Sequence, residues 1–127
     1  MEAKTHLGIN AGLVGEVVEL SEGGAECRLE TLETMSADAH GLVHGGFVFG
    51  LADYAAMLAV NHPNVVLGAA ESRFLAPVKV GESVVARAKV VEEKGKKRIV
   101  ECDAFVSDRH VFAATFTAFV LEKHVLD

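Results

Sequence analysis

The chain is poor in cysteine, with only two among its 127 residues. Cys27 and Cys102 lie far apart, and neither belongs to a Cys-x-x-Cys pair or has the cysteine and histidine spacing of a zinc site. The sequence therefore predicts no disulfide framework and no bound metal. A reducing cytoplasm is the simplest compartment for this cysteine usage, and we expect the protein there.

Positive charge is also scarce. The 12 lysine and arginine residues are outnumbered by 18 aspartate and glutamate residues, which gives a formal net charge of −6 at pH 7. Nucleic-acid binding needs a basic face that neutralises phosphates, so we expect no nucleic-acid partner. No apolar run reaches the roughly 20 residues that cross a bilayer. Residues 1–6 lack the basic start and apolar centre of a signal peptide, so we expect no membrane partner either.

Nothing in the sequence divides the chain. Half of its residues are hydrophobic, enough to build one sizeable core, and no linker, repeat or low-complexity segment occurs. We therefore expect a single domain spanning residues 1–127.

Two segments before residue 35 and four after residue 64 are predicted to be β-strands. The connections at 21–24, 94–97 and 107–110 have the length of hairpin turns, which favours an antiparallel meander. The predicted strands are Leu13–Leu20, Ala25–Thr34, Val65–Ala76, Ser83–Glu93, Arg98–Val106 and Val111–Glu122.

Between the second and third strands, an apolar run with almost no polar stripe predicts a helix that is covered on nearly all sides. It has about 17 residues, hence a length of ~25 Å. Pro63 cannot continue it and disfavours helical geometry at His62. Strands that precede and follow one apolar helix in the sequence predict an α+β fold, with an antiparallel sheet of about six strands wrapped around one long central helix.

Asp53 is the only formally charged residue between His44 and Pro63. Burying an ionised carboxylate without partners costs several kcal/mol, so such a residue is usually either tightly hydrogen-bonded or part of a reaction. Two interpretations are open: a buried acid that serves packing, and a catalytic acid. The His44-Gly45-Gly46 sequence just before the helix favours the second.

Three motifs resemble one known family. Residues 39–46 (Ala-His-Gly-Leu-Val-His-Gly-Gly) look like its active-site entry, and residues 49–53 (Phe-Gly-Leu-Ala-Asp) look like its helix with the catalytic acid. Residues 74–77 (Phe-Leu-Ala-Pro), followed by Gly81-Glu82, resemble the strand and turn that come next. Over roughly residues 13–121 the chain thus resembles the hotdog-fold acyl-CoA thioesterases, in particular the PaaI-like branch of phenylacetate degradation.

The resemblance implies hydrolysis of an acyl- or aryl-CoA thioester to the free acid and coenzyme A, with no further cofactor. It makes the Gly45 amide the oxyanion donor, where the N–H groups and positive dipole end of a helix favour negative charge. Asp53 is the general base or nucleophile. His44 either orients the substrate carbonyl or only caps the loop, and Gly46 is expected to contact the substrate. A residue that positions water stays open, with Glu71 and Ser72 as candidates.

The spacing of Gly45 and Asp53 has its own consequence. Eight residues of helix separate them by ~12 Å along the axis, too far for both to reach one carbonyl carbon. If they act together, a twofold dimer must bring Gly45 of one subunit to Asp53 of the other. The family's dimer architecture agrees, so we expect a homodimer, with a tetramer of two dimers as an alternative.

Basic residues suggest where coenzyme A phosphates bind. Lys97 and Arg98, in a basic cluster with Lys94 and Lys96, are candidates, although such a cluster is also typical of a solvated hairpin tip. Arg73 is a further candidate. The alternative function is a non-catalytic acyl-CoA-binding protein, which would not need Asp53, and a hydratase ranks last.

Overall fold

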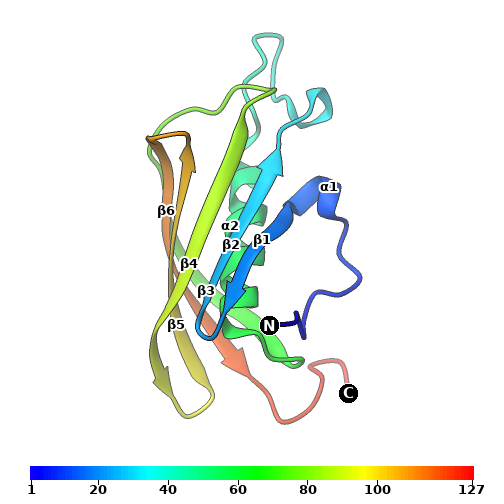
Figure 1. The fold of residues 1–127 in the computed structure, drawn as a ribbon, viewed down its shortest axis with the longest axis vertical. Coiled ribbons are helices and arrows are strands. Elements are labelled where there is room, and N and C mark those ends of the chain that lie inside the picture. Colours follow the sequence, from blue (N-terminus) through cyan, green and yellow to red (C-terminus); the bar gives the residue numbers. More distant parts are fainter.

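The computed structural model describes all 127 residues (Figure 1). Six antiparallel strands form one sheet in the order β1-β2-β4-β5-β6-β3, and the helix α2 packs against it. The predicted architecture of a sheet around one central helix is confirmed. The elements are α1 (Ala11–Val14), β1 (Glu16–Ser21), β2 (Gly24–Glu30), a 3-10 turn at Glu33–Met35, α2 (Gly45–Val60), β3 (Val65–Phe74), β4 (Ser83–Lys94), β5 (Lys97–Val106) and β6 (Arg109–Val120).

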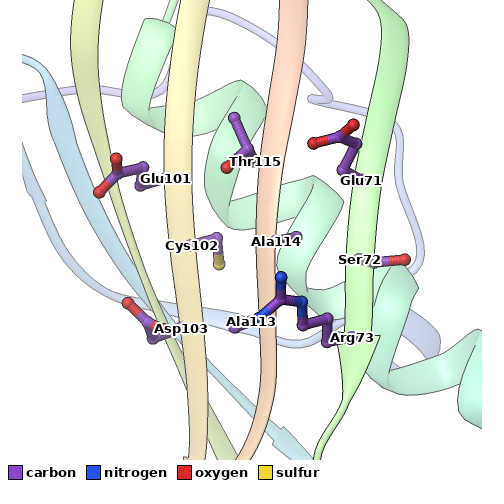
Figure 2. Close-up of a pocket in the computed structure, with 9 residues that line it drawn as sticks. All are labelled: Glu71, Ser72, Arg73, Glu101, Cys102, Asp103, Ala113, Ala114 and Thr115. Atoms are coloured by element: carbon purple, nitrogen blue, oxygen red, sulfur yellow. The ribbon is translucent and has the colours of Figure 1, made fainter.

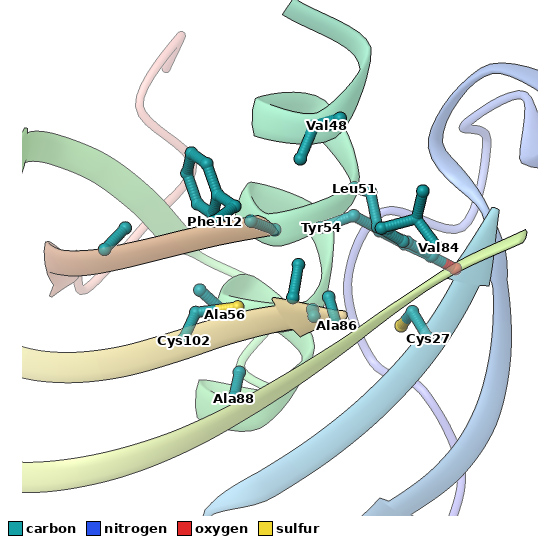
Figure 3. Packing of buried hydrophobic residues seen from close by; sticks show 14 of the residues in the cluster. Cys27, Val48, Leu51, Tyr54, Ala56, Val84, Ala86, Ala88, Cys102 and Phe112 are labelled. Carbon is teal, nitrogen blue, oxygen red and sulfur yellow. The ribbon is translucent and has the colours of Figure 1, made fainter. Parts of the chain in front are cut away.

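Small side chains let the helix lie close to the sheet (Figure 3). On β4 the residues alternate between buried and exposed, and two of the buried ones are Ala86 and Ala88. The facing helix contributes Ala52, Ala55 and Ala56, all with 0% of their surface exposed. Because alanine projects only a methyl group, these residues permit a close approach of helix and sheet.

The two ends of α2 are capped in different ways. Its N-cap, His44, has extended backbone and makes no side-chain capping bond. At the other end Asn61 adopts the left-handed conformation, with φ 51°, and its N–H donates to the Met57 carbonyl. Pro63 follows two residues later, and the helix ends before this proline, as the sequence predicted. No helix of the structure has the length and hydropathy that crossing a bilayer requires.

Two predicted strands differ from the observed ones by three or more residues at one end, and the others agree within two residues. Leu13 and Val14, predicted to start the first strand, belong instead to α1, which Asn10 caps by accepting a bond from the Gly12 N–H. The second strand stops at Glu30 because Thr31 leaves it. The Thr31 hydroxyl donates to the Glu82 carbonyl at 2.7 Å, which ties this corner to the turn before β4.

Gly15, the residue that ends α1, is closely packed against β2 and α2. Its φ of 107° suits glycine, and a Cβ there would lie 2.9 Å from the Arg28 carbonyl oxygen and 2.8 Å from Leu51 Cδ1. We expect Gly15→Ala to lower the free energy of unfolding by about 1–3 kcal/mol, measured by urea denaturation. Gly8→Ala is the matched control, since nothing lies within 4 Å of its Cβ position. Equal stability of the two variants would contradict this packing.

Candidate functional site

The start of α2 presents free backbone donors. The N–H groups of Gly45 and Gly46 have no hydrogen-bond acceptor in the chain, as expected for the first turn of a helix. The exposed His44 side chain stands next to them without a capping bond. A Cβ on Gly45 would lie 3.0 Å from Cε1 of Phe74 on β3, so glycine permits the close approach of that ring. The arrangement favours negative charge at this point.

An apolar cavity of about 360 Å³ opens beside Gly45. The loop before α2 and the first turns of the helix form one side, and the segment that follows β3 forms the other. Phe74, which is 58% exposed, contributes its ring to the wall. The lining residues are Leu42, Val43, Gly45, Val48, Phe74, Leu75, Ala76, Pro77, Val78 and Val111. The helix start therefore joins hydrogen-bond donors to an apolar hollow, a common combination in small-molecule sites.

Asp53 is half-buried in the middle of α2, and its Oδ1 is buried without a hydrogen-bond partner. Desolvation raises the pKa of this carboxyl group above its ordinary value, and the charge of His6 acts in the opposite direction. Buried polar atoms are normally paired. The interpretation of Asp53 as an acid held by hydrogen bonds therefore finds no bonded partner for Oδ1 within the chain.

Gly45 and Asp53 do not meet within one chain. Both belong to the continuous helix Gly45–Val60, so the axial separation of ~12 Å expected from their spacing applies. The neighbouring edge strand, β3, pairs only with β6, and its other edge has no partner in the chain. Residues 68–74 of this strand are exposed. The helix face with Asp53 and the free edge of β3 are thus both incompletely covered.

Arg73 lies on the outer face of the sheet, away from α2 (Figure 2). Because strand side chains alternate, and Phe74 packs toward Gly45, Arg73 faces the opposite way. Its guanidinium makes no hydrogen bond or ion pair in the chain and overhangs Ala113. Here a hollow of about 500 Å³ is lined by Glu71, Ser72, Arg73, Glu101, Cys102, Asp103, Ala113, Ala114 and Thr115.

Lys97 and Arg98 lie at the turn between β4 and β5, at the other end of the sheet from Gly45. Lys97 pairs with Phe119 of β6, which in turn pairs with Val66 near the start of β3. Phe74, which contacts the Gly45 position, is the last residue of β3. Lys97 is exposed. Arg98 donates to the Gly95 carbonyl at 2.7 Å and forms an ion pair with Glu93 at 3.6 Å. A single chain therefore does not bring these cations to the helix start.

His6, which the sequence analysis did not single out, lowers the pKa of Asp53 by its charge and lies with its ring centroid 6.1 Å from that of Tyr54. It lies far before Asp53 in the chain, in a segment without a regular pattern, so no local signal links the two. Asp38 orders the loop before α2, where its Oδ1 accepts bonds from the His40 and Leu42 N–H groups.

Comparisons with known proteins agree on one family, although the similar proteins carry different names. The family described as the thioesterase superfamily matches residues 40–113. A protein of Pyrococcus horikoshii, 55% identical, superposes with a TM-score of 0.99 over 100% of this chain and 98% of its own. A mutant of the phenylacetic acid degradation protein PaaI from Thermus thermophilus is 30% identical, with a TM-score of 0.80 over 86% of this chain and 95% of its own.

Two curated relatives are longer proteins. Methylthioribose-1-phosphate isomerase of Aquifex aeolicus is 53% identical over 96% of this chain, which spans 27% of the isomerase. The transcription factor FapR of Caldanaerobacter subterraneus subsp. tengcongensis is 31% identical over 98% of this chain, which spans 62% of that protein. Domains similar to this chain therefore occur as parts of proteins with different names.

Proposed function

Because this chain belongs to the thioesterase superfamily, with the hotdog fold and a resemblance to its PaaI-like branch, we propose that it is an acyl-CoA thioesterase. The reaction is hydrolysis of an acyl- or aryl-CoA to the free acid and coenzyme A, and the coenzyme is part of the substrate. The observation that carries the proposal is the half-buried Asp53 carboxyl group, whose Oδ1 has no partner, on the central helix of this fold.

The chemistry assigned to the residues is a general-base hydrolysis. A water attacks the carbonyl carbon and gives its proton to Asp53, while the developing oxyanion accepts from the Gly45 N–H. Collapse of the tetrahedral species breaks the carbon–sulfur bond, and the departing thiolate takes the proton back from Asp53. The raised pKa of Asp53 supports this role, since a stronger base accepts a proton more readily. Direct attack by the carboxylate is the alternative for the first step.

A second copy of the chain completes the site in this proposal. If the free edges of two β3 strands pair antiparallel about a twofold axis, the sheets join and the two helices lie antiparallel on the same side. Gly45 of one copy then faces Asp53 of the other. We expect the smallest active species to be a dimer, and activity and dimer to disappear together on dilution, followed by light scattering and turnover. A fully active monomer would contradict the shared site.

The same pairing gives the basic residues a role. It turns the second copy around, so its Lys97 and Arg98 come to the end of the joined sheet where Gly45 lies. There they would bind the diphosphate or 3′-phosphate of coenzyme A. Gly46, without a side chain, leaves room beside the oxyanion site. Arg73 would serve a phosphate on the outer face, next to the edge where the two chains meet.

A hydrolysis screen tests the proposal. The substrates are short-chain, long-chain and aryl acyl-CoA thioesters, and the readout is the released thiol. We expect turnover with at least one class, abolished in Asp53→Ala. Absence of turnover with every class, in a protein shown to be folded and dimeric, would refute the assignment.

The similarity to a transcription factor favours one other function, a non-catalytic acyl-CoA-binding domain. A binding domain has no need for a carboxylate opposite the oxyanion amide. Calorimetric titration with the same thioesters distinguishes the two, because tight binding without thiol release would identify a binding domain.

A further inference from the structure

The apolar cavity beside Gly45 offers no polar side chain to a ligand. Its volume is about 360 Å³, and none of its lining side chains carries a charge, a hydroxyl group or an N–H. Because Gly45, the proposed oxyanion donor, is one of the lining residues, the carbonyl carbon of a bound thioester lies at the edge of this cavity. Two parts of the substrate then compete for the space: the acyl group and the pantetheine arm of coenzyme A.

The backbone of the cavity walls is already engaged. The Val43 N–H donates to the Val78 carbonyl at 2.8 Å, and the N–H groups of Leu75 and Ala76 donate to the Val111 carbonyl at 2.9 and 3.3 Å. The pantetheine arm carries amides and a hydroxyl group, and burying such groups without partners is unfavourable. The walls therefore suit a hydrocarbon, so the acyl group is the part of the substrate that fits.

Phe74 forms the part of the wall next to Gly45. A Cβ built on Gly45 would lie 3.0 Å from Cε1 and 3.3 Å from Cδ1 of the Phe74 ring. The ring makes an edge-to-face contact with Phe112, which is fully buried beside α2 (Figure 3): the centroids are 5.1 Å apart and the planes are inclined by 71°. Phe112 in turn contacts Phe49 of α2 at 6.3 Å. Although Phe74 is 58% exposed, these contacts hold its ring at the helix start.

We propose that the cavity takes the acyl group, that this group is an uncharged hydrocarbon, aliphatic or aryl, and that Phe74 sets its maximum length. The ring occupies the space between the helix start and the segment after β3, so a smaller side chain at this position enlarges the cavity. A charged acyl group is excluded because no lining side chain compensates a buried carboxylate. The inference rests on the proposed function, since it names the substrate class of that hydrolysis.

A series of straight-chain thioesters, from butyryl-CoA to palmitoyl-CoA, measures the length limit. In the wild type, each methylene that enters the cavity should raise kcat/KM about fourfold, the factor that corresponds to burying one CH₂ group. The gain should stop when the cavity is full. Phe74→Ala should move this limit to longer chains, and the kcat/KM of a chain just beyond the wild-type limit should rise at least about tenfold relative to that of the best wild-type substrate.

Phe105→Ala is the matched control. This phenylalanine of β5 lies outside the cavity, where its ring stacks on His110 at 4.7 Å and beneath Arg87 Cζ at 5.4 Å. Its removal should leave the length limit unchanged. Phe74→Leu keeps an apolar side chain against Phe112 and replaces the alanine variant if circular dichroism shows that variant to be unfolded; its limit should lie between the two. A limit that is the same in the wild type and the folded Phe74 variant would overturn the inference.

A comparison of succinyl-CoA with isocaproyl-CoA tests the exclusion of charge. The carboxylate of the first is replaced in the second by an isopropyl group of similar size. We expect kcat/KM to be at least about 100-fold lower for succinyl-CoA. The adjoining hollow shares Leu42, Pro77 and Val78 with the cavity and contains Lys79 and Arg109. Similar kcat/KM values for the two thioesters would mean that these cations receive the carboxylate, and would overturn the uncharged class.

Binding without hydrolysis separates the inference from the proposed function. Ketone analogues, in which a methylene replaces the thioester sulfur, cannot be hydrolysed, and calorimetry gives their Kd over the same chain lengths. A protein that releases no thiol but binds these analogues with a length limit dependent on Phe74 would refute the thioesterase and retain the inference. Asp53-dependent turnover with a limit independent of Phe74 would retain the thioesterase and overturn the inference. Absence of both turnover and binding would overturn both.

Discussion

Asp53→Ala is expected to lower kcat at least ~100-fold on the best thioester, because the variant loses the base or nucleophile of the proposed reaction. The same change should raise the free energy of unfolding at pH 7. Burial raises the pKa of Asp53 above 3.8, so the folded protein holds this proton more tightly than the unfolded chain does. The stability due to this group is therefore greatest below pH 3.8 and is lost as the pH rises through the folded-state pKa.

The measurement combines steady-state kinetics with thermal unfolding at pH 4 and pH 7. The gain in melting temperature over the wild type should be larger at pH 7 than at pH 4, since a larger fraction of the carboxyl group is ionised at the higher pH. Asp53→Asn, which preserves size, controls for the cavity that alanine leaves. Turnover near the wild-type level in either variant would show that Asp53 is structural.

The second large effect is the recovery of activity when two inactive variants share a dimer. Gly45→Pro removes the proposed oxyanion N–H and suits the first position of a helix, because His44 already has the extended backbone that a residue before proline needs. Asp53→Ala removes the carboxylate. In a mixed dimer one site carries both changes and the other carries neither. With random pairing about half of the dimers are mixed, so recovery should approach roughly a quarter of wild-type activity.

Two controls keep this experiment interpretable. Gly45→Ala introduces the Cβ that meets Phe74 but retains the N–H, so it separates steric pressure from loss of the donor. Mass spectrometry of differently labelled subunits establishes exchange. If exchange is complete and no activity returns, Gly45 and Asp53 do not act across an interface.

Local sequence patterns were sufficient to predict the fold but not the exact ends of some of its strands. The apolar run that ends before Pro63 predicted α2 closely because periodicity and a helix breaker are local signals. Leu13 and Val14 were assigned to a strand because a short apolar run has no period of its own. Their helical conformation depends on the Asn10 cap and the positive φ of Gly15. Thr31 likewise leaves β2 for a bond to residue 82, which no local pattern reports.

The same reasoning explains what the sequence says about the candidate site. The separation of Gly45 and Asp53 follows from helix geometry alone and applies in the structure. Sequence proximity does not show which side of the sheet a strand residue takes, so Arg73 was named as a candidate for a phosphate contact without its position on the outer face being foreseen. His6 lies beside Tyr54 on α2 in a segment that is also bound by Asn61, which accepts from the Lys4 N–H 57 positions away, and no local pattern reports such contacts.

The alanine contact between α2 and the sheet has a consequence for how specificity can evolve. Buried alanines fill the contact between helix and sheet, whereas the apolar cavity lies beside the helix start and the larger hollow lies on the outer face, so we expect a substrate at the margins of the fold. Residues such as Phe74 and Leu75, which are largely exposed, can then be exchanged with little effect on folding. A lineage can therefore change its preferred acyl group while the interior, and with it the stability of the protein, stays the same.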